Sequence, residues 1–288
     1  MESSNWKTWI GALSLLLLSC LVLLPGIASA DPVIDISIGG QTRQFGRDEL
    51  LRRPDVSEVT IANDVAYGRT MSYRAVPLAA LLVGLKPPAD AVIDTVATDG
   101  FVAHLPFDIL INKDPAKAVA WLAVEPADAP WPPLPGKTSS AGPFYVVWTG
   151  ASVAAIRSEQ WPYQLKRIES QPLPVERWPA LDVEPALPAN DPLRAGLALF
   201  VTQCLPCHTL NGAGASHMGP DLNQPMNPTR YMTPDALRAL IRDPKSVRSW
   251  PAQQMPGFSS DQLSDHELDL IVGYLSHMAA RPKTGERR

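Results

Sequence analysis

The feature that most constrains this chain is a five-residue segment in its C-terminal third, Cys204-Leu205-Pro206-Cys207-His208. Two thiols three positions apart, followed at once by an imidazole, is the spacing by which a c-type haem is attached. Each thiol adds across one vinyl group, and the next residue places its imidazole beneath the iron as proximal ligand. A redox-active Cys-x-x-Cys pair and half of a zinc site are the alternatives. The segment therefore predicts one covalent haem c, attached at Cys204 and Cys207 and ligated by His208.

The cysteine count and the start of the chain indicate an exported protein. Only Cys20 lies outside the attachment segment, so no disulfide is expected. A lysine precedes an apolar run over residues 10–24, and Ala28-Ser29-Ala30 forms a small-residue cleavage site. We expect residues 1–30 to be a signal peptide, cleaved before Asp31, that directs the protein to the periplasm. Two alternatives stay open: the run is retained as a membrane anchor, or the chain is lipidated at Cys20.

Length, charge and proline content indicate the broad organisation. The 288 residues are enough for two ordinary domains, and the net charge of −4 predicts no nucleic-acid partner. The 30 prolines, about twice average usage, favour loops, linkers and short strands over a long helical bundle. After the signal peptide we expect a first domain over 31–170, an extended proline-rich linker over 171–192, a second domain over 193–282 and a tail over 283–288.

The pattern of residues 31–170 predicts short strands mixed with short helices. Apolar and polar residues alternate over 33–38, and Gly39-Gly40 turns the chain into a hairpin partner at 41–45. Apolar runs at 118–124 and 144–148 fit buried strands. Further strands are expected at 57–61, 91–96 and 101–105, and short helices at 48–52 and 77–83. The region is therefore expected to be an α+β domain with a mixed sheet.

Three stretches of this region carry a resemblance. They are Tyr73-Arg74-Ala75-Val76-Pro77-Leu78 with Leu81-Leu82, then Ala97-Thr98-Asp99-Gly100-Phe101, then Gly142-Pro143-Phe144-Tyr145-Val146-Val147-Trp148. Together they resemble the molybdopterin-binding domain of the sulfite oxidase family, in compact form. That family holds molybdenum through a cysteine thiolate, and no cysteine lies between Asp31 and Phe200. The resemblance, with this departure, implies a relative without a molybdenum cofactor that serves docking, ligand binding or scaffolding; catalytic molybdenum is the alternative.

Two features of the same region allow both a functional and a structural interpretation. His104 could be a ligand, but a lone histidine on a strand is more often structural. The aromatic side chains could line a pocket, although we expect them to cap the core. They are Trp131, Trp148, Trp161 and Tyr163.

The region after the linker carries a more specific resemblance. Residues 192–203 predict a helix leading into the attachment segment, and Gly219-Pro220-Asp221-Leu222 follows the segment. These features resemble a class I cytochrome c, which implies an all-α domain. Gly196 and Phe200 match the positions that this family uses for helix packing. In that family the carbonyl of the proline matching Pro220 accepts the proximal imidazole N–H, which fixes the tautomer and raises ligand basicity.

Helix-capping signals extend this pattern towards the C-terminus. Thr233-Pro234 is suited to start a helix that Pro244 ends. Ser264 and Glu267 form a capping box for the last helix. Gly273-Tyr274 lies where we expect that helix to cross the first one.

The second axial ligand is assigned to Met255, in Gln254-Met255-Pro256-Gly257-Phe258. A thioether favours the ferrous state and raises the reduction potential. Class I cytochromes carry this methionine on a loop before the C-terminal helix, commonly followed by proline, and Met255 matches both conditions. The rival nitrogen ligand is His217, which lies very close in sequence to His208. The remaining methionines are interpreted as core fillers: Met218, Met226, Met232 and Met278.

A basic cluster lies on or after the middle helix of this region. It consists of Arg238, Arg242, Lys245 and Arg248. These side chains are expected to pair with haem propionates, to form a basic docking face, or to be solvated.

The combined pattern predicts a carrier of one electron rather than an enzyme. His208 and Met255 fill both axial positions, so no substrate binds at iron, and the partner is a periplasmic or membrane redox protein. The first alternative is a cytochrome subunit of, or fused to, a molybdenum-type oxidoreductase whose electrons the haem drains. The second is a ligand-binding module that gates a membrane oxidoreductase.

Overall fold

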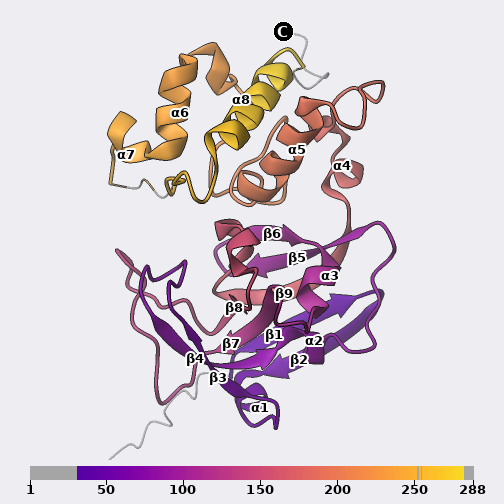
Figure 1. Ribbon diagram of the computed structural model, residues 1–288, viewed down its shortest axis with the longest axis vertical. Helices are drawn as coiled ribbons and strands as arrows, with labels where there is room; N and C mark the ends of the chain where they lie inside the picture. Colours follow the sequence, from indigo (N-terminus) through magenta and orange to yellow (C-terminus); the bar gives the residue numbers. More distant parts are fainter. Residues whose placement is uncertain (1–30, 252, 254, 282–288) are drawn as a thin grey trace, which may run out of the picture. The chain divides into compact units, whose positions relative to one another are not determined.

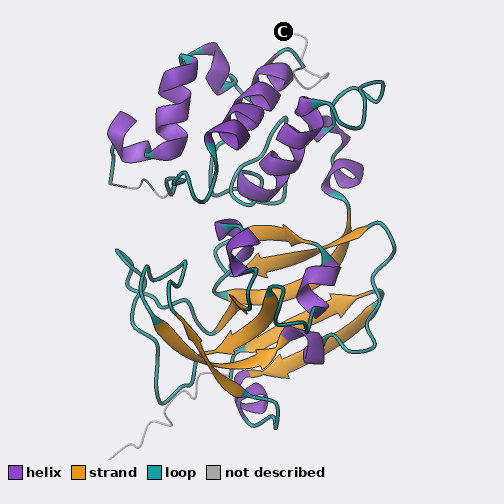
Figure 2. Ribbon diagram, in the orientation of Figure 1, coloured by secondary structure: helices purple, strands orange, loops and turns teal. Residues whose placement is uncertain are grey.

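The computed structural model describes residues 31–251, 253 and 255–281. The predicted signal peptide, and the anchor and lipidation alternatives, therefore lie outside the described residues. In this described part no helix is both long enough and apolar enough to cross a bilayer. Buried side chains form two separate hydrophobic cores. The first is made by residues from Ile34 to Ile168 of the sequence, and the second by residues from Leu181 to Met278. The strands belong to the first and the longer helices to the second (Figures 1 and 2).

The first core lies between two sheets. The five-stranded sheet has the order β2-β1-β9-β5-β6, and β1 pairs in parallel with β9 while its other pairs are antiparallel. Its strands are β1 (Val33–Ile38), β2 (Gln41–Gly46), β5 (Ala91–Ala97), β6 (Val102–Leu105) and β9 (Leu165–Pro172). The expected mixed α+β class is therefore confirmed for this region.

The second sheet is antiparallel, with the order β3-β4-β7-β8. Its strands are β3 (Ser57–Ile61), β4 (Met71–Pro77), β7 (Val119–Val124) and β8 (Phe144–Thr149). Short helices complete the region: α1 (Arg47–Leu51), α2 (Leu78–Leu81), α3 (Phe107–Ile111) and the 3-10 helices η1 (Val153–Ala155) and η2 (Ser158–Gln160). The sequence pattern did not predict β4, β9 or α3.

Residues 171–192 are packed against the second core instead of forming the extended spacer that their prolines predict. The segment contains α4 (Pro174–Arg177) and the 3-10 helix η3 (Pro179–Leu181). Leu181 and Val183 are buried in the second core, and the Tyr274 hydroxyl donates to the Leu181 carbonyl at 2.5 Å. Two apolar side chains between the prolines therefore attach the segment to the helical region.

Four helices make up most of the second core, and their caps follow the sequence. They are α5 (Pro192–Gln203), α6 (Pro234–Arg242), α7 (Pro244–Val247) and α8 (Asp265–Ala279), with the 3-10 helix η4 (Pro228–Arg230) between the first two. Thr233 accepts from the Ala236 amide, and Ser264 forms the capping box with Glu267. Both predicted caps are confirmed.

Helices α5 and α8 cross at Gly196. A Cβ there would collide with the Leu270 carbonyl of α8, and the Phe200 and Tyr274 rings lie 5.3 Å apart between centroids. Gly273 is exposed, and a Cβ added to it would meet nothing within 4 Å. The prediction that Gly273 marks the crossing is therefore wrong, whereas the one for Tyr274 is confirmed.

Candidate functional site

The attachment segment continues α5 as a tight turn. The Cys204 amide donates to the Phe200 carbonyl at 2.9 Å, and the Cys207 and His208 amides both donate to the Cys204 carbonyl. Leu205 is fully buried and anchors the turn in the second core. Both cysteines are free thiols and half-buried. The turn therefore carries the two thiols and the imidazole on one short, fixed piece of backbone.

The orientation of His208 is determined by the loop that follows. Its Nδ1 lies 2.8 Å from the Pro220 carbonyl oxygen. Because a carbonyl only accepts, Nδ1 carries the proton and the lone pair of Nε2 is left for a metal. Burial lowers the pKa of His208, partly offset by the bond to Pro220 and the charge of Asp221, and this shift favours the neutral imidazole. Gly219 makes room for the ring, since a Cβ there would lie 2.6 Å from Nδ1.

Asp221 organises the loop that carries Pro220, a role that its sequence context does not predict. Its carboxylate accepts five hydrogen bonds, from the Thr209 hydroxyl and the amides of Asn211, Gly212, Asn223 and Gln224, at 2.6–3.1 Å. Hydrogen bonds to a charged group are the stronger kind. This one side chain therefore joins the chain after His208 to the chain after Pro220.

A row of buried asparagines ties the same loop to α8. The Asn223 side-chain amide donates to Asn211 at 2.8 Å and to the Met278 carbonyl at 2.9 Å. The Asn227 amide donates to Asn223 at 2.8 Å and to the Leu275 carbonyl at 3.0 Å. The three asparagines are buried, so their amides need these partners. The loop is thus held against the last two turns of α8.

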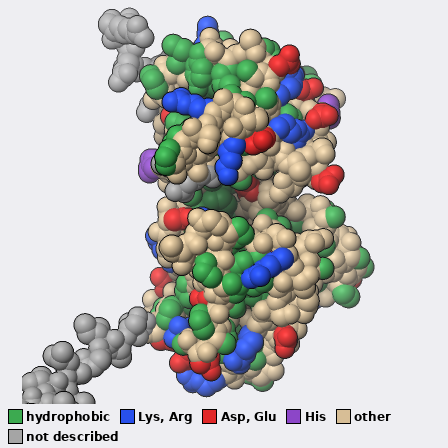
Figure 3. Space-filling view, turned by 90° about the vertical axis from the view of Figure 1, so that its left-hand side faces the viewer, with side chains coloured by type: hydrophobic (Ala, Val, Ile, Leu, Met, Phe, Trp, Pro, Cys, Tyr) green, Lys and Arg blue, Asp and Glu red, His purple; other side chains and the backbone are tan. Residues whose placement is uncertain are grey.

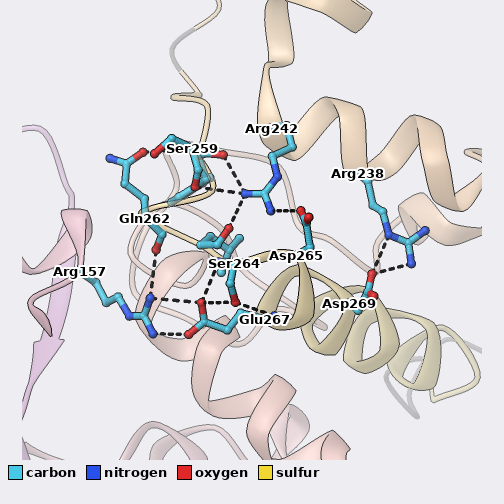
Figure 4. Close-up of polar contacts among 11 residues, drawn as sticks. Arg157, Arg238, Arg242, Ser259, Gln262, Ser264, Asp265, Glu267 and Asp269 are labelled. Carbon is cyan, nitrogen blue, oxygen red and sulfur yellow. Dashed lines mark hydrogen bonds and ion pairs between the residues drawn. The ribbon is translucent and has the colours of Figure 1, made fainter. Parts of the chain in front are cut away.

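Met255 lies on the loop between α7 and α8. It packs, partly buried, against the same core as Cys204. Arg242 holds the following part of the loop, because its guanidinium donates to the carbonyls of Phe258 and Leu263 (Figure 4). A cavity of about 360 Å³ opens beside Met255. Gln253 lines it, and the buried amide of this side chain has no partner among the described residues.

These observations fit a bound haem. The imidazole offers Nε2, and two thiols lie on the same turn. Met255 and the unpaired amide of Gln253 border a separate cavity, whose lining residues all lie between Asp243 and Gly257. A haem held in this way supplies a one-electron redox couple. Residues 193–279 match the family model described as Cytochrome c. The C-terminal region is a cytochrome c domain. No curated protein matched the chain significantly.

The match implies haem c in this region. The other residues considered as a ligand or as core fillers, one histidine and four methionines, differ in their exposure. His217 lies in an exposed part of its loop. Met278 is buried and Met232 is partly buried, as core fillers should be. Met218 and Met226 are 41% and 56% exposed, so the core-filler interpretation is wrong for these two.

The part of the chain that carries the two sheets, called the sheet region below, covers the attachment turn of the cytochrome c domain. The Val102 amide, on the edge strand β6, donates to the Pro206 carbonyl at 3.4 Å. Glu159, on η2, is buried, and burial raises the pKa of its carboxyl to about 7. Burial, together with the charge of Glu159, raises the pKa of Cys204 and of Cys207 to about 12. A carboxyl of the sheet region thus lies close to both attachment thiols.

A second contact joins the sheet region to α8. The guanidinium of Arg157 pairs with the Glu267 carboxylate and donates to the Gln262 carbonyl at 3.1 Å (Figure 4). The hydrogen bond from Arg157 lowers the pKa of Glu267. Glu267 therefore has two functions, because it also closes the capping box of α8. Neither Arg157 nor Glu159 was singled out from the sequence.

His104 lies in a buried pair that reaches α4. Its Nδ1 is 2.5 Å from Asp94 Oδ1, and Arg177 of α4 donates to Asp94 Oδ2 at 2.6 Å. The Trp178 ring contacts the His104 ring at 6.2 Å between centroids. These contacts support the structural interpretation of His104.

The aromatic side chains of the sheet region pack against one another in its core. Trp131 meets Tyr73 at 4.7 Å, and Tyr145 lies between Trp161 and Tyr163 at 6.5 and 6.3 Å. A cavity of about 440 Å³ borders Trp148 and Trp161. Most of the set therefore caps the core, while two of its members also line this cavity.

Proposed function

We propose that the protein is a periplasmic carrier of one electron, with a single haem c whose iron is ligated by His208 and Met255. The cytochrome c domain makes the chain a haem-based electron carrier. The observation that supports the proximal half is the bond from His208 Nδ1 to the Pro220 carbonyl. It holds the proton on Nδ1, raises the basicity of Nε2 and prevents the ring from rotating.

The distal half of the proposal assigns a soft ligand to the loop before α8. The Met255 thioether favours the ferrous state, and Arg242 stiffens the loop through the Phe258 and Leu263 carbonyls. With both axial positions occupied, no substrate binds at the iron. The surrounding residues position the haem, shield it and exclude water. The domain is proposed to be of the all-α, class I type.

The proposed ligand is tested by replacing Met255 with Ala. The variant should open the sixth position, bind carbon monoxide when reduced, and have a lower reduction potential. Met218→Ala and Met226→Ala are the matched controls, because both side chains are exposed. They should leave carbon monoxide binding and potential nearly unchanged. Ready binding of carbon monoxide by the wild type would contradict the proposed axial pair.

Covalent attachment is tested separately from ligation. Cys204→Ser and Cys207→Ser each remove one thioether and should weaken covalent retention, and the double variant should lose haem in a denaturing gel. Full retention by the double variant would refute the attachment site.

For residues 31–170 we propose a relative of the sulfite-oxidase-type domain that holds no molybdenum and serves to dock and shield the haem. The competing hypothesis is a cytochrome subunit of a molybdenum-type oxidoreductase. Metal analysis of the purified protein separates them, because iron alone supports the carrier and molybdenum with iron supports the alternative. N-terminal sequencing of the exported protein tests cleavage before Asp31.

A further inference from the structure

A carboxyl of the sheet region is enclosed beside the haem attachment turn. Glu159 lies on η2, which packs against α5 and β6. Helix α5 runs directly into the attachment turn, whose Pro206 carbonyl accepts from Val102 of β6. Glu159 is 9% exposed, and burial and then the charge of its carboxylate raise the pKa of both attachment thiols. The carboxyl is therefore held between the two regions, close to the sulfur atoms that carry the haem.

The basic side chains next to Glu159 on η2 and β6 have other partners. Arg157, which precedes η2, pairs with Glu267, and His104 of β6 pairs with Asp94. Within the described part of the chain, no ion pair to Glu159 is found. Its carboxylate is therefore a buried charge without a cation beside it, and this burial raises its pKa to about 7.

Helix α5 and the surroundings of the attachment turn supply no compensating charge either. Arg194 of α5 donates to backbone carbonyls within 184–188 at 2.9–3.3 Å. After burial and Glu159, the pKa of Cys207 is raised by Asp99 and lowered by Lys137. Both of these side chains are exposed, so solvent and salt screen them. The thiols themselves become uncharged thioethers when the haem is attached.

Charged groups on other parts of the surface keep a constant charge near neutral pH. Arg238 and Arg242 of the predicted basic cluster pair with Asp269 and Asp265, each at 2.7 Å (Figure 4). Figure 3 shows acidic and basic side chains interspersed on one face of the molecule, rather than a field of one sign. Exposed carboxyls ionise near pH 4 and lysines near pH 10, at about their reference values. A group that titrates near pH 7 beside the haem therefore stands apart from them.

We propose that Glu159 takes up a proton when the haem is reduced and releases it when the haem is oxidised. The inference rests on the proposed function. On reduction one electron enters the haem, and one O–H bond forms on the carboxylate with a proton from solvent; on oxidation the electron and the proton both leave. The 9% of the side chain that stays exposed gives solvent protons access to it. The sheet region would thereby couple electron transfer to a proton.

The charge of the iron is the physical reason. Each attachment thiol bonds to a carbon next to the porphyrin ring, so a carboxylate close to the thiols is also close to the ring. The ferric haem carries one more positive charge than the ferrous haem, and an opposite charge favours the ionised carboxylate. We expect the proton affinity of Glu159 to be about tenfold higher in the reduced protein. By linkage, ionisation of Glu159 stabilises the ferric state and lowers the reduction potential.

This coupling gives the pH dependence of the potential its sign and size. At low pH the carboxyl is protonated in both redox states, so the potential should be level. It should fall as the pH rises through about 7 and become level again once the carboxyl is ionised in both states. A tenfold difference in proton affinity corresponds to a total fall of about 59 mV for one electron.

Redox titration of the haem-loaded protein between pH 5 and pH 9 tests the coupling. The wild type should show the fall, whereas Glu159→Gln should keep the low-pH potential throughout. Glu159→Asp retains a carboxyl and should retain a fall. Asp99→Asn is the matched control, because it removes an exposed carboxyl that acts on the same thiol; it should behave as the wild type. An unchanged fall in Glu159→Gln would assign the proton to a histidine or a propionate and overturn the proposal.

Infrared spectroscopy identifies the proton acceptor directly. The reduced-minus-oxidised difference spectrum of the wild type at pH 7 should gain the C=O band of a protonated carboxyl, and a pH-indicator dye should record proton uptake. Glu159→Gln should lack both signals. Absence of both from the wild type would refute the proposal. Ready binding of carbon monoxide by the wild type would instead contradict the proposed axial pair, and the carboxyl band would still decide the role of Glu159.

Discussion

Replacing Glu159 with Gln should remove a pH dependence of stability that this carboxyl introduces. Glu159 is 9% exposed, and burial raises the pKa of its carboxyl from 4.5 to about 7. Below pH 4.5 the group is protonated in both folded and unfolded chains, so it does not change the free energy of unfolding. As the pH rises towards 7, the unfolded chain ionises first, and unfolding becomes progressively more favourable.

The size of this effect follows from the difference between the two pKa values. Each pKa unit corresponds to about 1.4 kcal/mol, so a rise from 4.5 to about 7 amounts to about 3 kcal/mol. The free energy of unfolding of the wild type should fall by this amount between pH 4.5 and 7, and the contribution should stay level above pH 7. Glu159→Gln lacks the ionisable group, so its profile should lack this fall.

Denaturant unfolding of the haem-loaded protein at pH 5 and pH 8 provides the measurement. At pH 8 the variant should be the more stable protein, and at pH 5 the gap should shrink or change sign. Glu58→Gln is the matched control, because Glu58 is exposed on β3; it should keep the wild-type profile. Parallel profiles for the wild type and Glu159→Gln would refute the reasoning.

Three further predictions use the same unfolding assay. Gly196→Ala should cost about 2 kcal/mol by overpacking the α5–α8 crossing, whereas Gly273→Ala, in open space, should stabilise by about 0.5 kcal/mol; the reverse order would contradict the assigned crossing. Asp221→Ala should cost about 3 kcal/mol, because five donors lose a charged acceptor. Arg157→Ala should cost about 1 kcal/mol at neutral pH, since the pair is partly exposed. The cost should fall as acid protonates Glu267, although the bond from Arg157 to the Gln262 carbonyl remains; a pH-independent cost would rule out the ion pair as its cause.

The parts of the site that sequence reasoning could reach are those whose spacing is local. Cys204, Cys207 and His208 lie on one turn, so their chemistry is readable from five letters. The caps at Thr233 and Ser264 are equally local, because a cap bonds only two or three residues ahead. The role of Pro220 could be predicted only from the family resemblance, since nothing in the sequence around it indicates that its carbonyl faces an imidazole.

The parts that could not be predicted depend on contacts between distant segments. Glu159 looks like an ordinary surface carboxyl in the sequence, but in the folded chain it is buried and close to the attachment thiols. Asp221 collects donors from two loop segments that meet only in the folded chain. The prolines of 171–192 indicate an extended chain, but Leu181 and Val183 find a hydrophobic core to enter. Hydrophobic burial thus outweighed the local conformational preference.

The bond between Val102 and Pro206 has a consequence for any attempt to separate the two regions. Strand β6 is an outer strand of its sheet, and an outer strand with unpaired amides is a template for aggregation. In the full chain the attachment turn occupies part of that edge. In a truncated protein that ends after β9, the Val102 amide would be unpaired, and Arg157 and Glu159 would be uncovered. This edge of the sheet would then be prone to aggregation. A lysine should therefore be introduced on this outer strand to reduce aggregation before such a fragment is judged unable to fold.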